Sequence, residues 1–269
     1  MSRLKLFFLL RRHNRLAFRR NPAYEQSVVA KVMMVIGAGM MMVYLIFIGT
    51  MFGAMASESQ TPALILMMLL LFLLVIDFSS RFVVQKTPAM LIKPYMLLPL
   101  PRRAVVETFL FTSLTSGYNF LWLSMFLPYT FIIFCGGASL ATALSVLVCG
   151  MLLILANSQF YLLVRTLVGR SLLWWVLPVM VYGMPIGLLL LSTLDSSDFP
   201  SFLSFLSPVA ARIEDFFDNM VDAMEQQWFL LLCLFLLALL LWVNRITQFR
   251  FAFDEESQIG RAAGRERVE

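Results

Sequence analysis

The residues of this chain that could carry chemistry are few, and most lie inside long apolar runs. Asp77 and Arg81 are four residues apart in VIDFSSRF, so a helix would place both on one face, where they can pair. Ionised groups are costly inside a membrane. The pair is therefore either a gate or substrate contact, or an ion pair that anchors the end of a helix. Glu107, in the following apolar run, is predicted to meet a cation of the loop before it.

Four polar side chains lie deeper in two further runs. Tyr118 and Asn119 occur in SGYNF, and Asn157 and Gln159 occur in LANSQF. Such side chains usually bridge helices, but they line a polar pathway if they face the axis of a bundle. Projection into one shared interior would favour transport, whereas isolated bridges would favour a scaffold.

Wider motifs exclude most enzyme chemistry. His13 is the single histidine, so no HExxH zinc motif is possible, and neither a GxSxG elbow nor a GxxxxGK[ST] phosphate loop occurs. Cys135, Cys149 and Cys233 have no metal-ligand spacing and are expected to pack as apolar residues. We predict no catalytic residue, no metal, no cofactor and no ATPase activity of the chain's own.

The elements that hold these residues follow from composition. Of the 269 residues, 60% are hydrophobic and 14% are charged, whereas soluble domains average about 45–50% and about 25%. Several runs exceed the roughly 18 apolar residues that mark a membrane span. We predict an all-α polytopic membrane protein with six transmembrane helices, at about residues 28–55, 62–84, 105–134, 140–164, 172–194 and 228–249.

Two of these spans are predicted to be irregular. The third, at about 1.5 Å per residue, would cover about 45 Å against a hydrocarbon core of about 30 Å. It must therefore tilt, kink at Pro128 or follow one interface. In the fifth span Pro178 and Pro185 each remove a backbone hydrogen bond, which predicts a bent or broken helix.

The lysines and arginines set the orientation. All of them except Arg212 fall on one side of the predicted spans, and cytoplasmic segments carry such an excess, so both termini are predicted to be cytoplasmic. Because the positive charge follows topology, we expect no nucleic acid as a partner. Residues 27–249 are predicted to form the transmembrane domain. Residues 1–26 before it are predicted to form either an interfacial amphipathic helix or a basic flank that directs insertion. Residues 208–227 are predicted to form an external amphipathic helix, and residues 250–269 a disordered tail.

The cytoplasmic loop 85–103, QKTPAMLIKPYMLLPLPRR, differs from its surroundings. Four prolines and four cations exclude a continuous helix, and a much shorter linker would suffice to join two spans. We predict a partner-docking surface formed by Gln85, Lys86, Pro94, Tyr95, Pro99, Arg102 and Arg103.

The order of these elements resembles the permease subunit of ABC-2-type exporters. In that superfamily an elbow helix precedes the first span, the loop after span two docks on the ATPase, and external helices precede span six. The stretch IDFSSRFVVQKTPAMLIKPYMLLPLPRRAVV also resembles the signature of a bacterial family of ABC-type permeases, and the opening LLRRHNRLAFRRNPAYEQSVVAK is similar to its start. The matching positions are Asp77, Arg81, Gln85, Lys86, Pro88, Pro94, Tyr95, Leu98, Pro99, Arg102 and Arg103.

The resemblance implies a permease subunit of an ATP-driven exporter in the bacterial inner membrane, with an ABC ATPase docked on the loop 85–103. Members of that family are commonly longer, with a further membrane half, so this chain would pair with a second permease half as a homodimer or heterodimer. A non-transporting membrane scaffold or assembly factor explains the lack of catalytic motifs equally well. An intramembrane enzyme is a third alternative, and the lone His13 speaks against it.

Overall fold

The structure is a computed structural model, and it describes residues 5, 7–9, 11–13, 16, 28–59, 62–85, 102–187 and 227–265. Regular secondary structure in these residues is helical throughout, so the predicted all-α class is confirmed. The elements are α3 (Val28–Glu58), α4 (Pro62–Val84), α6 (Arg102–Leu114), α7 (Gly117–Leu121), α8 (Leu123–Cys135), α9 (Leu140–Val168), the 3₁₀ helix η1 (Leu172–Trp175), α10 (Val176–Pro178), the π-helix η2 (Val179–Gly183) and α13 (Gln227–Arg265).

Within the described part of the chain, three helices are long and apolar enough to cross a membrane. They are Val35–Glu58, Leu140–Val168 and Phe229–Arg250, and the bent pair Val105–Leu121 and Leu123–Cys135 makes a fourth candidate if it counts as one span. Only 11%, 33% and 17% of the most apolar stretches of the three helices are buried. Most apolar side chains of Val35–Glu58 and Phe229–Arg250 are exposed, which suits lipid and not water. The chain is a membrane protein.

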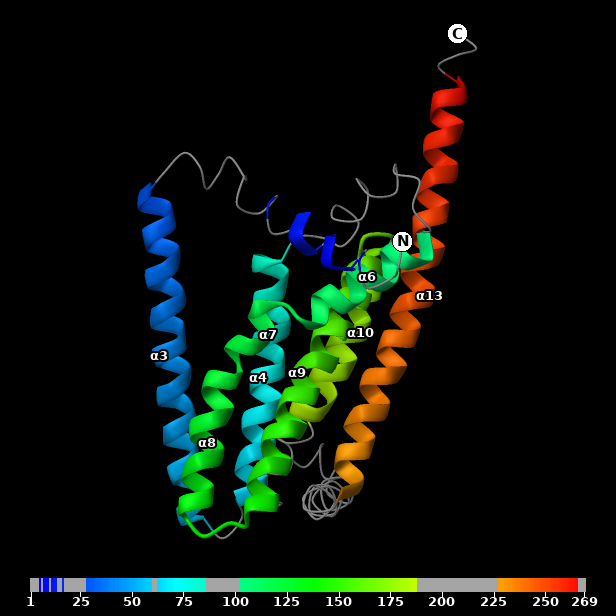
Figure 1. The fold of residues 1–269 in the computed structure, drawn as a ribbon. Coiled ribbons are helices and arrows are strands. Elements are labelled where there is room, and N and C mark those ends of the chain that lie inside the picture. Colours follow the sequence, from blue (N-terminus) through cyan, green and yellow to red (C-terminus); the bar gives the residue numbers. More distant parts are fainter. Residues whose placement is uncertain are drawn as a thin grey trace, which may run out of the picture.

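Successive helices run in alternating directions through one bundle, as Figure 1 shows. α3 descends, α4 returns, the segment from α6 to α8 descends, and α9 returns. The segment from η1 to η2 then descends, and α13 returns. The start of α3 and the end of α13 consequently lie at the same end of the bundle, the upper end in Figure 1.

The largest buried cluster joins α3, α4, α8 and α9, with Met125 and Phe126 fully buried at its centre. Glycines let α3 approach α8 closely. A Cβ atom on Gly49 would lie 2.2 Å from the carbonyl oxygen of Met125, and one on Gly53 would lie 3.1 Å from that of Tyr129. The two glycines have the GxxxG spacing at which membrane helices meet. This contact was not predicted from the sequence.

The third apolar run bends at Trp122 and not at Pro128. The segments Val105–Leu121 and Leu123–Cys135 meet there at 58°, and Pro128 lies inside the continuous helix α8. The predicted irregular course is confirmed. A kink at Pro128 was one of three alternatives, and the bend lies at Trp122 instead. The indole nitrogen of Trp122 donates a hydrogen bond to the buried Asp77.

The fifth apolar run is also irregular, as predicted. Its described part, Leu172–Gly187, passes from 3₁₀ to α and then to π winding. Pro185 has no N–H for the carbonyl of Val181, so regular winding is interrupted at the π-helix. Isolated π turns of this kind often occur at functional sites.

The predicted terminal and loop elements have different outcomes. The helix 208–227, except for its last residue, and most of the loop 85–103 lie outside the described residues. The described residues from 5 to 16 are helical, which fits one of the two alternatives for the segment 1–26. α13 continues as one helix to Arg265, where a disordered tail from residue 250 was predicted. An existing helix extends without a new nucleation step, which explains the continuation.

Candidate functional site

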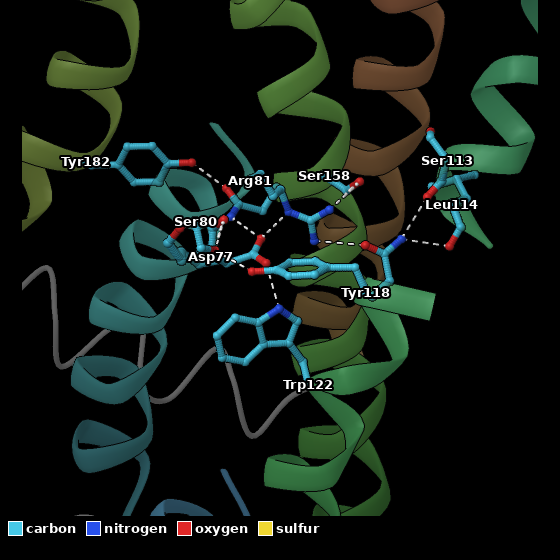
Figure 2. Close-up of polar contacts among 12 residues, drawn as sticks. Asp77, Ser80, Arg81, Ser113, Leu114, Tyr118, Trp122, Ser158 and Tyr182 are labelled. Atoms are coloured by element: carbon cyan, nitrogen blue, oxygen red, sulfur yellow. Dashed lines mark hydrogen bonds and ion pairs between the residues drawn. The ribbon is translucent and has the colours of Figure 1, made fainter. Parts of the chain in front are cut away.

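The most polar part of the bundle is centred on Asp77, in the second half of α4. Its side chain is fully buried and accepts three hydrogen bonds, drawn in part in Figure 2. Arg81 Nε donates at 2.8 Å and Asn157 Nδ2 at 2.7 Å, both to Oδ2, while Trp122 Nε1 donates at 2.6 Å to Oδ1. Donors from three separate segments therefore satisfy one carboxylate.

Arg81, one helical turn further along α4, is equally buried and extends the contacts in other directions. Its NH1 group donates to Ser158 Oγ at 3.1 Å and its NH2 group to Asn119 Oδ1 at 2.8 Å. Its Cζ atom lies 4.8 Å from the centre of the Tyr118 ring, a cation–π distance. The predicted pairing of Asp77 with Arg81 is thus confirmed as a buried ion pair.

The amide of Asn119 explains how the chain tolerates the turn between α6 and α7. Its Nδ2 donates to the carbonyl oxygens of Ser113 (3.0 Å) and Leu114 (2.8 Å). The last carbonyls of a helix lack partners within that helix, and leaving them unpaired in a buried site is costly. Asn119 therefore caps the end of α6 with its amide nitrogen and holds Arg81 with its amide oxygen.

Asn157 on α9 connects the buried pair to the π-helix. Its Nδ2 donates to the Leu74 carbonyl at 2.9 Å as well as to Asp77, and its Oδ1 accepts from the hydroxyl of Tyr182. Tyr182 belongs to η2, so both irregular segments of the bundle contact the same cluster. We call this cluster the polar hub, and its side chains are those of Asp77, Ser80, Arg81, Tyr118, Asn119, Trp122, Asn157, Ser158 and Tyr182.

Ser80 closes the hub on the side of α7. Its hydroxyl bonds to the Tyr118 hydroxyl and donates to the Asp77 carbonyl at 2.9 Å. Tyr118 therefore contacts α4 twice, through its ring face at Arg81 and through its hydroxyl at Ser80.

A second set of amides continues the polar contacts towards α13. Gln159 Nε2 donates to Ser113 Oγ at 3.0 Å, while its carbonyl oxygen and Oε1 accept from Asn244 Nδ2 at 2.7 and 3.3 Å. Gln159 and Asn244 are both fully buried. Ser113 lies next to the carbonyls that Asn119 caps, so this set adjoins the hub.

Two further contacts of arginine side chains lie nearer the end of the bundle. Glu107 pairs with Arg245 of α13, whose NH2 lies 2.6 Å from Oε1. This pairing agrees with the packing of α6 against α13. Most of the loop whose cation was predicted to meet Glu107 lies outside the described residues, so that prediction stays a prediction. Arg165 NH1 donates to the carbonyl of Phe82 at 2.8 Å, which fastens the end of α9 to the end of α4.

The predicted docking residues are described only in part. Lys86, Pro94, Tyr95 and Pro99 lie outside the described residues. Gln85 follows α4, and its carbonyl accepts from the Tyr161 hydroxyl at 3.4 Å. Among the cations, Arg102 begins α6. The guanidinium of Arg103 lies 5.5 Å from the centre of the Phe249 ring.

The hub holds segments of the bundle together. Both charges are paired and hydrogen-bonded, which is the condition for keeping charges in a low-dielectric interior. No group of three or more metal-ligating side chains occurs among the described residues. Removing one member of a buried pair costs about 3–5 kcal/mol, so the hub fixes how α4, α7, α9 and η2 meet.

Several hub members were not predicted from the sequence: Ser80, Trp122, Ser158 and Tyr182, with Ser113 and Asn244 beside them. The available signals were weak. Trp122 lies one helical turn after Tyr118, and Ser158 lies between two predicted amides. Tyr182 lies between the two prolines of the fifth run. Residues of these types are common in membrane helices and do not indicate burial in a shared site.

Apolar helices around a buried, fully paired polar hub define an α-helical integral membrane protein. A family-level comparison matches residues 14–263, nearly the whole chain. The chain belongs to this family, a family of unknown function designated DUF5687. No curated protein and no solved structure matches it.

Proposed function

We propose that this chain is the membrane-spanning permease subunit of an ATP-driven, ABC-2-like exporter whose ATP hydrolysis occurs in a separate subunit. The observation that carries the proposal is the polar hub. Tyr118, Asn119 and Asn157 project into one interior around the buried pair. Gln159, the fourth predicted side chain, bridges to α13 beside it. A shared polar interior between broken helices is typical of transporters.

The connection of the hub to the loop 85–103 supports a role in coupling. Gln85 lies one helical turn after Arg81, and α6 begins at Arg102 and ends at the carbonyls that Asn119 caps. A motor subunit docked on this loop would therefore pull on both helices that leave it. Both helices lead directly into the hub, so the movement would reach the broken third run and η2.

Six spans and cytoplasmic termini are part of the proposal. α4 is a 23-residue helix whose two charges, both in its second half, pair with each other, and the run that starts at Leu172 stays apolar to residue 194 in the sequence. The start of α3 and the end of α13 lie at the same end of the bundle in Figure 1, as an even number of crossings requires. A second permease half and the inner membrane of a bacterium complete the assembly.

Affinity capture of the tagged chain from native membranes in mild detergent tests the proposal. We expect a subunit with a GxxxxGK[ST] phosphate loop to be recovered with it. Combined substitution of Tyr95, Arg102 and Arg103 by alanine should abolish that recovery while membrane insertion stays normal. Intact membranes that yield no nucleotide-binding subunit would contradict the proposal.

A membrane scaffold is the second candidate, and one observation favours it. Asp77 and Arg81 have no exposed surface, and their partners occupy the positions that a substrate would need. The same capture experiment separates the two functions, because a scaffold would recover other membrane proteins without an ATPase.

A further inference from the structure

We propose that a basic pocket between α6 and α13 binds the headgroup phosphate of an anionic phospholipid, with an acyl chain lying along α13. This site is distinct from the polar hub and does not depend on the proposed export function.

The pocket has a volume of about 240 Å³ and combines charge with aromatic surface. Arg103 of α6 faces Arg245 and Arg250 of α13 across it, and Trp242, Ile246 and Phe249 complete most of its lining. All three arginines are exposed, so a ligand can reach them from outside the bundle.

The charges of the pocket suit an anion. Glu107 lies 2.6 Å from the NH2 group of Arg245 and compensates one guanidinium. The residues that line the pocket add two further arginines and no carboxylate, so the lining itself carries positive charge. The guanidinium of Arg103 stacks near Phe249, at 5.5 Å from its ring centre. A guanidinium presents a planar fork of donors that matches phosphate oxygens.

The depth of the pocket matches a lipid headgroup. It lies at the last two turns of the candidate span Phe229–Arg250, where a helix leaves the hydrocarbon. Trp242 is 60% exposed, and exposed tryptophan is enriched at this interface. Basic pockets between helices at such an end bind anionic headgroups.

An apolar stripe distinguishes a lipid from free phosphate. Below the pocket α13 exposes several apolar side chains. Four of them recur three or four residues apart, which places them on one face, and between 42% and 65% of each is exposed. They are Leu232, Phe235, Leu239 and Trp242. Ile246 and Phe249 continue the same spacing into the pocket, so one molecule with a charged head and an apolar tail fits both surfaces.

Binding of lipids to the purified, delipidated full chain in detergent tests the inference. The probes are dioctanoyl phosphatidylglycerol, the matching phosphatidylcholine and inorganic phosphate, each titrated against intrinsic tryptophan fluorescence and checked by native mass spectrometry. We expect saturable binding of phosphatidylglycerol, and much weaker binding of phosphatidylcholine and of inorganic phosphate.

The variant R103Q/R250Q tests the site itself. Near a membrane surface each arginine contributes about 1 kcal/mol to the attraction of an anionic lipid, so losing two should weaken binding roughly 30-fold. The control is R170Q, which removes an exposed arginine after α9 that does not line the pocket. We expect the control to bind as the unchanged chain does.

Five outcomes would overturn the inference. Equal binding of the choline lipid would show a site that ignores headgroup charge, and equal binding of inorganic phosphate would show an anion site without a lipid. Equal weakening in R170Q would show general attraction to a basic surface. Unchanged binding in R103Q/R250Q, or self-association of the chain through α13 in place of lipid binding, would equally rule out the pocket.

R103Q/R250Q and R170Q keep all hub residues, so we expect both to unfold at the same temperature as the unchanged chain without lipid. If they do, weaker lipid binding does not result from a loss of fold. The readout needs no ATPase and no transport. Failure here therefore leaves the proposed export function standing, and failure of ATPase capture leaves the lipid site standing.

Discussion

The indole nitrogen of Trp122 donates a 2.6 Å hydrogen bond to Oδ1 of Asp77, which lies 45 residues earlier in the chain. This bond joins the bend of the third apolar run to the buried ion pair of α4. The bend thus lies where a tertiary partner is available, six residues before the nearest proline of that run, Pro128. Figure 2 shows Trp122 below the ion pair, with Tyr118 between the bend and the guanidinium.

Substitution of Asp77 by asparagine tests how much the ion pair contributes. It leaves Arg81 charged and buried without a counter-charge, so we expect a loss of about 3–5 kcal/mol in unfolding free energy. Thermal unfolding in detergent, followed by labelling of the buried thiols of Cys149 and Cys233 with a fluorogenic dye, measures the change.

The double variant D77N/R81M removes the stranded charge and should recover part of that loss. The control E58Q changes an exposed acid at the end of α3 and should leave unfolding unaltered. A single variant D77N that unfolds like the unchanged chain would contradict the structural role of the pair.

Substitution of Trp122 by phenylalanine removes the indole donor and keeps most of the ring. Hydrogen bonds to charged groups are worth about 1.5–3 kcal/mol, and Asp77 keeps its two other donors. We expect a loss near the lower end of that range, measured by the same assay. The matched change W174F, at a tryptophan that is 43% exposed, should have little effect, and equal losses in both variants would exclude a special role for Trp122.

Substitution of Tyr182 by phenylalanine removes the hydroxyl that bonds Asn157 and leaves the ring packed on Phe78 and Phe160. The π-helix η2 should then open more often, because the contact between its side chains and the hub is weakened. Hydrogen–deuterium exchange of peptides covering residues 179–187 should become faster. The control Y44F alters an exposed tyrosine of α3, and unaltered exchange in Y182F would show that η2 is held by apolar packing alone.

Substitution of Gly49 by alanine places a Cβ atom where only 2.2 Å separates it from the Met125 carbonyl oxygen. Since backbone must shift to relieve this overlap, we expect a loss of about 1–3 kcal/mol, the usual range for overpacking. Gly37 lies on the same helix with nothing within 4 Å of its Cβ position, so G37A is the matched control. Equal unfolding temperatures for G49A and G37A would contradict the close contact of α3 with α8.

Local patterns determined the class of this protein. Apolar run length and composition are properties of short segments, and a membrane acts on each segment separately, so the helical membrane class followed from the sequence alone. The pairing of Asp77 with Arg81 was also predictable, because both residues lie on one helix and the spacing of four is local.

Only the tertiary structure decided what surrounds that pair. Trp122, Asn157 and Tyr182 come from three other segments, and nothing in their own neighbourhoods indicates that they meet. Glu107 likewise pairs with Arg245 of α13, far along the chain. Pro128 marked one possible bend of the third run because its lost hydrogen bond is a local effect, whereas the observed bend at Trp122 lies beside a distant partner, Asp77. The sequence therefore determined which segments enter the membrane, and packing between them decided where their few polar groups are satisfied.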